Sequence, residues 1–101
     1  MKLDPITYEV VRHRLWQIND EAGSTIRTIA TSPIVVEGND FNVGIFTREG
    51  QIAVTGPYVL SHVTTMDAVI QNVIRLVADD VQDGDMFKLN DPYLGALHQN
   101  D

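Results

Sequence analysis

The stretch TTMDAVIQNVIRLV, residues 64–77, decides the fold class of this chain. Its apolar side chains are separated by three positions and by one in turn: Met66, Val69, Ile70, Val73, Ile74 and Val77. Because an α-helix has about 3.6 residues per turn, this spacing places them all on one face. We therefore predict an amphipathic helix that begins near Thr64 or Thr65 and buries this apolar stripe in a core.

A longer helix is expected upstream of this stretch. Asp4 is a favourable N-cap residue, and Pro5 suits the first helical position, where no backbone N–H is needed. Apolar residues then recur at helical spacing as far as Ile29. The helix should end at Ser32-Pro33, because a residue before proline avoids the α region. At 1.5 Å per residue it would be about 40 Å long, which is long for such a short chain.

Short strands are predicted on either side of the second helix. Residues 41–47 and 51–55 should form a hairpin, with Gly50 supplying the positive φ of its turn. After the helix, a turn at 83–85 should lead into a further short strand at 86–89. The expected fold is α+β, in which the long N-terminal helix and the second amphipathic helix pack on a small antiparallel sheet. Residues 1–101 would form a single domain.

The composition excludes several classes of protein. The 101 residues include 7 basic and 14 acidic side chains and no cysteine. Without cysteine there is no disulfide framework, no thiolate zinc site and no cysteine nucleophile. So acidic a surface is a poor match for a phosphate backbone, and nucleic acid is not expected as a partner. No apolar run approaches the ~18 residues of a membrane span and no signal-peptide pattern is present, so we expect no membrane partner and a cytoplasmic location.

Histidines and aspartates are the residues that could carry chemistry, because the sequence has no glycine-rich phosphate loop and no nucleophile elbow. His98 and Asp101 form an H-x-x-D pair, whose side chains share one face of a helix or turn. Imidazole and carboxylate are suitable ligands for zinc, manganese or iron. Two ligands do not make a site, but Asp40, before an apolar strand, and His62, before the second helix, could contribute from a distance.

Each candidate also has a purely structural interpretation, which spacing alone favours. Asp40 can be a turn acid that caps a nearby N–H, and His62 a packing residue at the start of a helix. Asp91, which precedes Pro92, is typical of an Asx turn. The H-x-x-D spacing itself occurs often by chance.

Several segments match those of one family in the same order along the chain. They are DPIT at 4–7, SP at 32–33, EGNDFNVGIF at 37–46, SHV at 61–63 and GD at 84–85. The strongest is NDPYLGALHQND at 90–101, which is similar to a motif that reads approximately N-D-P-Y-x-G-G-x-H-x-x-D. On these segments, the chain resembles the hydantoinase B/oxoprolinase family.

The resemblance implies ATP-dependent chemistry on a cyclic amide such as hydantoin, 5-oxoproline or a lactam. A hydantoinase A-type partner subunit would bind ATP-Mg and phosphorylate the substrate. The B-type subunit would then complete the hydrolysis with a divalent metal, either zinc, manganese or iron. Carried over residue by residue, the resemblance implies Asp40, His98 and Asp101 as metal ligands and His62 and Asp91 as residues near the site. It also implies a hetero-oligomer.

Two alternatives stand beside this hydrolase. Subunits of ATP-dependent acetone and acetophenone carboxylases carry the same motifs, so a ketone is the alternative substrate. The other alternative is a non-catalytic assembly module whose loop acids are solvated. Because family subunits are several times longer, we expect residues 1–101 to be a truncated N-terminal portion that is inactive alone.

Overall fold

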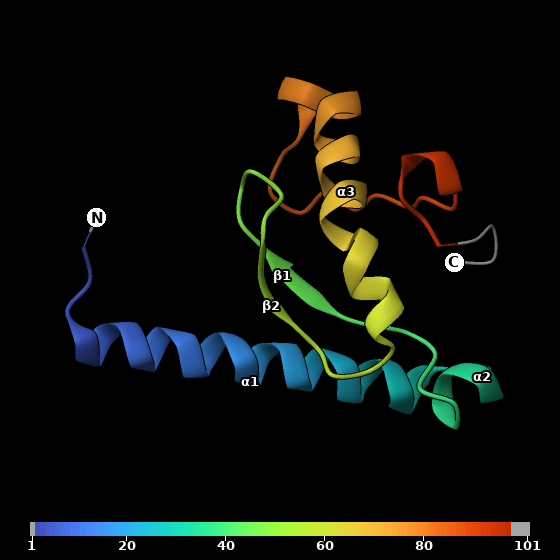
Figure 1. The fold of residues 1–101 in the computed structure, drawn as a ribbon, viewed down its shortest axis with the longest axis horizontal. Coiled ribbons are helices and arrows are strands. Elements are labelled where there is room, and N and C mark those ends of the chain that lie inside the picture. Colours follow the sequence, from blue (N-terminus) through green and yellow to red (C-terminus); the bar gives the residue numbers. More distant parts are fainter. Residues whose placement is uncertain (1, 98–101) are drawn as a thin grey trace.

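The computed structural model describes residues 2–97 and shows an α+β fold (Figure 1). Its elements are α1 (Pro5–Ile29), α2 (Pro33–Val36), β1 (Gly44–Phe46), β2 (Ile52–Thr55), α3 (Leu60–Val77) and two 3₁₀ turns at Ala78–Asp80 and Pro92–Leu94. The β1–β2 hairpin contacts both long helices. In Figure 1, α1 runs along one side of the molecule and α3 rises steeply away from it. The predicted fold class is therefore confirmed.

Helix α1 begins where the sequence predicts. Asp4 is its N-cap: Oδ1 accepts a hydrogen bond from the Thr7 N–H at 3.0 Å and Oδ2 accepts one from the Thr7 hydroxyl at 2.6 Å. The helix ends at Ile29, somewhat before the expected stop at Ser32-Pro33. Pro33 instead begins the short helix α2, which the sequence did not predict, because proline suits the first position of a new helix as well as it ends an old one.

The two strands form the predicted antiparallel hairpin, but each is shorter than expected. Gly44 pairs with Thr55, and a bulge falls between Ile45 and Phe46. Gly50 closes the turn with φ 82°, and its N–H donates to the Thr47 carbonyl at 3.0 Å. Only β1 and β2 pair in the part of the chain that the structure describes.

Helix α3 begins at Leu60, which is several residues before the predicted start. His62 therefore lies in its first turn rather than in the preceding loop. The predicted apolar stripe faces the hairpin side and the 92–94 turn, but its side chains are half-buried rather than fully buried. The fold of residues 2–97 thus leaves part of this stripe within reach of solvent.

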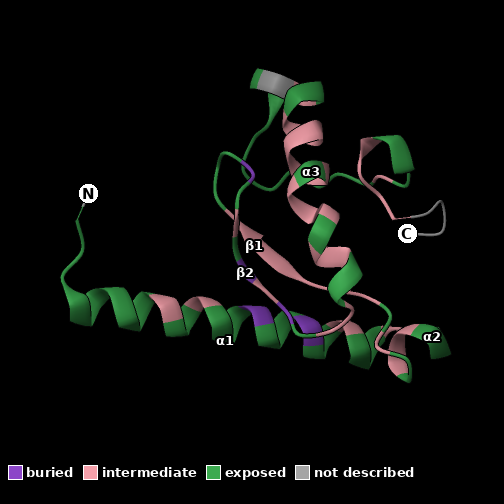
Figure 2. Ribbon diagram, viewed as in Figure 1, coloured by how far each residue is buried: buried purple, intermediate pink, exposed green. Residues whose placement is uncertain are grey.

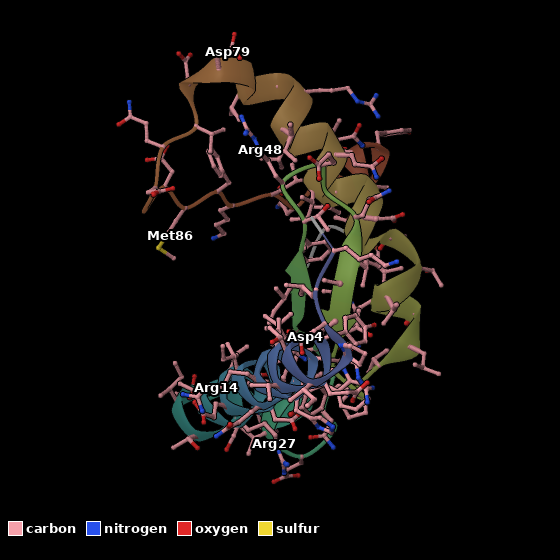
Figure 3. All side chains as sticks on the ribbon, turned by 90° about the vertical axis from the view of Figure 1, so that its left-hand side faces the viewer. Asp4, Arg14, Arg27, Arg48, Asp79 and Met86 are labelled. Carbon is pink, nitrogen blue, oxygen red and sulfur yellow. The ribbon has the colours of Figure 1, made fainter. Side chains whose placement is uncertain are left out.

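The strand predicted at 86–89 is wrong. The turn at 83–85 forms, with the Asp85 N–H donating to the Gln82 carbonyl at 3.1 Å, but the chain after it is irregular. Met86 is 94% exposed, and Figure 3 shows its side chain extending away from the helices. A strand needs a partner to satisfy its N–H and C=O groups, and this segment pairs with no strand in the described chain.

The core is small and lies between the second half of α1 and the hairpin (Figure 2). Asn19 on α1 is 2% exposed and Val54 on β2 is 6% exposed. Gly23 is buried as well, because the ring of Tyr58 lies directly over it: a Cβ at Gly23 would come within 2.7 Å of the Tyr58 Cε2. Tyr58 in turn stacks on Phe41, with ring centroids 4.3 Å apart.

The first half of α1 projects beyond this core. Ile6 is 78% exposed and Val10 is 64% exposed, and Figure 2 shows this half of the helix mostly in the colour of exposed residues. Within residues 2–97, no helix combines the length and the hydropathy that a membrane-spanning segment requires.

Candidate functional site

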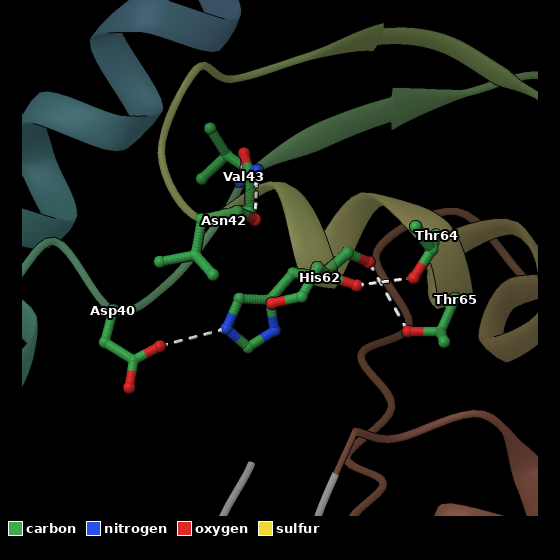
Figure 4. Close-up of polar contacts among 8 residues, drawn as sticks. Asp40, Asn42, Val43, His62, Thr64 and Thr65 are labelled. Carbon is green, nitrogen blue, oxygen red and sulfur yellow. Dashed lines mark hydrogen bonds and ion pairs between the residues drawn. The ribbon is translucent and has the colours of Figure 1, made fainter.

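Asp40 and His62 come together although they are 22 residues apart in the sequence (Figure 4). The His62 Nε2 lies 3.2 Å from the Asp40 Oδ1. Asp40 belongs to the loop after α2, and its side chain is 44% exposed. His62 belongs to the first turn of α3, and its side chain is only 19% exposed. The structure therefore pairs two of the residues that the sequence singled out.

The backbone around Asp40 is fixed by hydrogen bonds to α2 and to its own neighbours. The Asp40 N–H donates to the Ile34 carbonyl at 3.1 Å, and the Phe41 N–H donates to the Asn39 carbonyl at 2.8 Å. Asn39 has φ 52°, a left-handed conformation that asparagine tolerates better than most residues. Its side-chain Oδ1 is buried and has no hydrogen-bond partner in the described part of the chain. The loop thus presents Asp40 from a defined backbone and leaves an unused acceptor beside it in the sequence.

The backbone around His62 is tied to the same loop. The His62 N–H donates to the Val59 carbonyl at 3.2 Å, and the Asn42 side-chain amide donates to that carbonyl at 3.1 Å. The Val59 N–H returns a bond to the Phe41 carbonyl at 3.3 Å. Asn42 therefore clamps the segment after Asp40 to the segment before His62. Sequence reasoning missed this role, for which the one signal was an asparagine in a predicted strand, where asparagine is disfavoured.

A cavity of about 240 Å³ opens beside His62. Its walls are mainly apolar and come from β1, α3 and the C-terminal segment: Phe46, Met66, Val69, Ile70, Leu89, Gly95, Ala96 and Leu97. Asn42, His62 and Thr65 supply the polar part of the lining. The C-terminal segment is held to α3 by the Asn72 side-chain amide, which donates to the Leu94 carbonyl at 2.9 Å. Leu97, the last described residue, therefore reaches the same cavity as His62.

Of the other predicted site residues, only Asp91 lies within the described part of the chain. Asp91 forms the Asx turn that its position before Pro92 predicted, with its Oδ1 accepting from the Tyr93 N–H at 2.9 Å. The bonds that the structure gives Asp91 are thus those of its own turn. His98 and Asp101 lie outside the described residues, so their predicted role as metal ligands stays a prediction.

Asp40 and His62 are side chains of a type that binds divalent metals, but two such side chains do not make a complete metal site. A carboxylate and an imidazole are ligands that zinc, manganese and iron accept. No cluster of three or more such side chains that could hold a metal ion exists within residues 2–97. A metal at Asp40 that takes three histidine or carboxylate ligands would draw at least one of them from residues outside that range.

Comparison with known proteins identifies the family of this chain. Residues 4–101 match the family Hydantoinase B/oxoprolinase, and the chain belongs to that family. It is 27% identical over 100 residues to the 5-oxoprolinase PfmaA of Pestalotiopsis fici and 31% identical over 101 residues to the acetone carboxylase alpha subunit of Xanthobacter autotrophicus. It is 26% identical over 102 residues to an uncharacterized protein of Methanocaldococcus jannaschii.

These relatives are much longer than the chain. Each alignment covers 97–99% of this chain, but only 8% of the oxoprolinase, 13% of the carboxylase subunit and 18% of the archaeal protein. No solved structure matches the chain.

Proposed function

We propose that this chain is the N-terminal part of the B-type subunit of an ATP-dependent enzyme that hydrolyses a cyclic amide: hydantoin, 5-oxoproline or a related lactam. Family membership and the similarity to a 5-oxoprolinase support the proposal. A hydantoinase A-type subunit would be its partner in a hetero-oligomer, bind ATP-Mg and phosphorylate the substrate. Dependence on ATP favours a cytoplasmic enzyme. The chain aligns with only a small part of each relative's length, which supports the proposal that the 101 residues alone are inactive.

In this proposal Asp40, His98 and Asp101 hold a divalent zinc, manganese or iron ion. One observation carries it: Asp40 contacts His62 beside a cavity whose wall ends at Leu97, the residue before His98. Because His98 follows Leu97 in the sequence, this cavity supports the proposal that the H-x-x-D motif supplies ligands near Asp40. A bound metal would polarise an oxygen or lower the pKa of bound water, which provides hydroxide at neutral pH.

The residues that line the cavity would suit a cyclic amide, whose ring carbons are apolar and whose amide group is polar. The apolar walls of the cavity exclude water from one side of a ligand, and this strengthens electrostatic interactions at its polar end. Asn42, His62 and Thr65 offer hydrogen-bonding groups at that end. Asp40 adds a negative charge that a cation would offset.

Metal content tests the assignment of Asp40. In the protein expressed from its complete reading frame, Asp40→Ala should lose bound metal, because a carboxylate ligand is removed. Asp20→Ala is the matched control, since Asp20 is an exposed aspartate on α1 that belongs neither to the pair nor to the lining of the cavity. Elemental analysis of the purified variants gives the metal per chain. Equal metal in Asp40→Ala and in the unmodified protein would remove Asp40 from the site.

A ketone carboxylase is the second candidate, and the 31% identity to an acetone carboxylase subunit favours it. The two candidates differ in what stimulates ATP consumption by the complex with the A-type subunit. A hydrolase should consume ATP with hydantoin or 5-oxoproline and without bicarbonate. A carboxylase should require both a ketone and bicarbonate. The isolated 101-residue chain should support neither reaction, and turnover by it would contradict the proposal that further chain is needed.

A further inference from the structure

We infer that His62 is a positioning residue for Asp40: its Nε2–H donates to Oδ1 and fixes the carboxylate so that the other oxygen is available to a metal ion. This inference rests on the proposed function, because it takes Asp40 as a metal ligand. The two side chains are 3.2 Å apart between these atoms. Figure 4 shows the second carboxylate oxygen directed away from the imidazole.

The burial of the two side chains gives the direction of this effect. The Asp40 side chain is 44% exposed and lies on a loop, so by itself it would sample several rotamers. The His62 side chain is 19% exposed and stands on the first turn of α3. Its backbone is anchored at Val59, which Asn42 also holds. The fixed partner is therefore His62, and the partner that gains order is Asp40.

The chemistry of the contact separates positioning from direct metal binding. An ionised carboxylate only accepts hydrogen bonds, so a favourable contact requires the proton of the imidazole on Nε2. The Nε2 that carries the proton has no lone pair for a metal, and Nδ1, which keeps one, lies on the side of the ring away from Asp40 (Figure 4). In this arrangement His62 acts on the metal through Asp40, as hydrogen-bond partners of ligating carboxylates do in other metal sites.

Three variants of His62 test the inference in the protein expressed from its complete reading frame. His62→Gln keeps an N–H donor at a similar reach, His62→Asn has a donor that is too short, and His62→Phe has none. Affinities for Zn²⁺ and Mn²⁺ are measured by competition with a chromophoric chelator, and thermal unfolding of the metal-free variants is recorded beside them. We expect His62→Asn and His62→Phe to lose metal affinity by roughly 10–100-fold, and His62→Gln to stay within about threefold of the unmodified protein.

His13→Phe is the matched control, because His13 also faces a carboxylate, with Nε2 3.6 Å from the Glu9 Oε2, but on the exposed surface of α1. It should leave metal affinity unchanged. The rescue by glutamine separates positioning from a merely structural role, since a structural loss would appear as altered unfolding with unaltered affinity. If His62→Phe does not fold, the contrast between His62→Gln and His62→Asn still decides the question.

Other outcomes overturn the inference in distinguishable ways. Loss of affinity in His62→Gln as severe as in Asp40→Ala would make His62 a ligand. Unchanged affinity in both His62→Asn and His62→Phe, with affinity lost in Asp40→Ala, would refute the positioning role and leave the proposed metal site intact. Unchanged affinity in Asp40→Ala, or no binding by the unmodified protein, would refute the proposed site itself.

Discussion

At the scale of single residues, Asp4 shows how a local hydrogen bond changes an ionisation equilibrium. The Thr7 hydroxyl and the Thr7 backbone N–H both donate to its carboxylate, and these bonds hold the pKa of Asp4 below its ordinary value of 3.8. The charged form is therefore favoured by the folded state. Its contribution to stability is complete above pH 3.8 and is lost as the pH falls through the lowered pKa of the folded chain.

We predict that Asp4→Asn weakens this acid dependence. Asparagine is also a good N-cap, but it does not ionise, so the helix start keeps a cap whose strength does not change with pH. Thermal unfolding from neutral pH to below pH 3 should show a smaller loss of melting temperature in Asp4→Asn than in the unmodified chain. The pKa of Glu9 is lowered by its hydrogen bond to Arg12. Glu9 is present in both proteins, so its contribution to the acid dependence is the same in both and does not affect the comparison. Parallel acid profiles would contradict the role given to Asp4.

At the scale of elements, α3 is stabilised by the face that lines the cavity. Ile70 lies on this half-buried face, whereas Leu76 on the same helix is 67% exposed. We predict that Ile70→Lys lowers the free energy of unfolding by about 2–3 kcal/mol, because a charge replaces an apolar contact. Leu76→Lys should change it by no more than about 0.5 kcal/mol. Urea unfolding followed by circular dichroism measures both, and equal losses would mean that α3 packs through another face.

Local sequence signals predicted that the two long helices exist better than they predicted the residues at which those helices begin and end. The Asp4 cap, the Asx turn at Asp91 and the periodicity of α3 depend on neighbours within a few positions, and the sequence contains those neighbours. The start of α3 was misplaced because Thr64 and Thr65 are typical of an N-cap. In the structure their hydroxyls donate backward instead, to the Ser61 carbonyl at 2.7 Å and to the His62 carbonyl at 3.4 Å, inside a helix that has already begun.

Non-local features could not be predicted in the same way. The strand expected at 86–89 had suitable residues but forms no pairing in the described chain, and the sequence does not state which strands will pair. The contact between Asp40 and His62 likewise joins the loop after α2 to the first turn of α3, and the Asn42 clamp that aligns them depends on the carbonyl of Val59. Family resemblance pointed to both residues, but their distance came from the structure.

At the scale of the whole molecule, stability is distributed unevenly along α1. Its first half is mostly exposed, with only Arg12 and Leu15 half-buried, while Asn19 and Gly23 in the second half are buried. We predict that backbone amides of residues 8–16 exchange with deuterium at least roughly tenfold faster than those of 20–27, which corresponds to about 1.4 kcal/mol in opening free energy. Hydrogen exchange read by NMR or mass spectrometry measures this, and a dilution series controls for self-association. Uniform protection along α1 in dilute solution would contradict the prediction.

The close approach of Tyr58 to Gly23 has a consequence for protein engineering. A redesign guided by helix propensity would choose Gly23→Ala, since alanine is better than glycine in a helix interior by about 1 kcal/mol. Here the added methyl group would meet the Tyr58 ring, which stacks on Phe41, the residue that follows Asp40. The substitution in α1 would therefore disturb, through Tyr58 and Phe41, the loop that carries Asp40. Thermostabilising libraries for this chain should leave position 23 fixed and vary the exposed half of the helix instead.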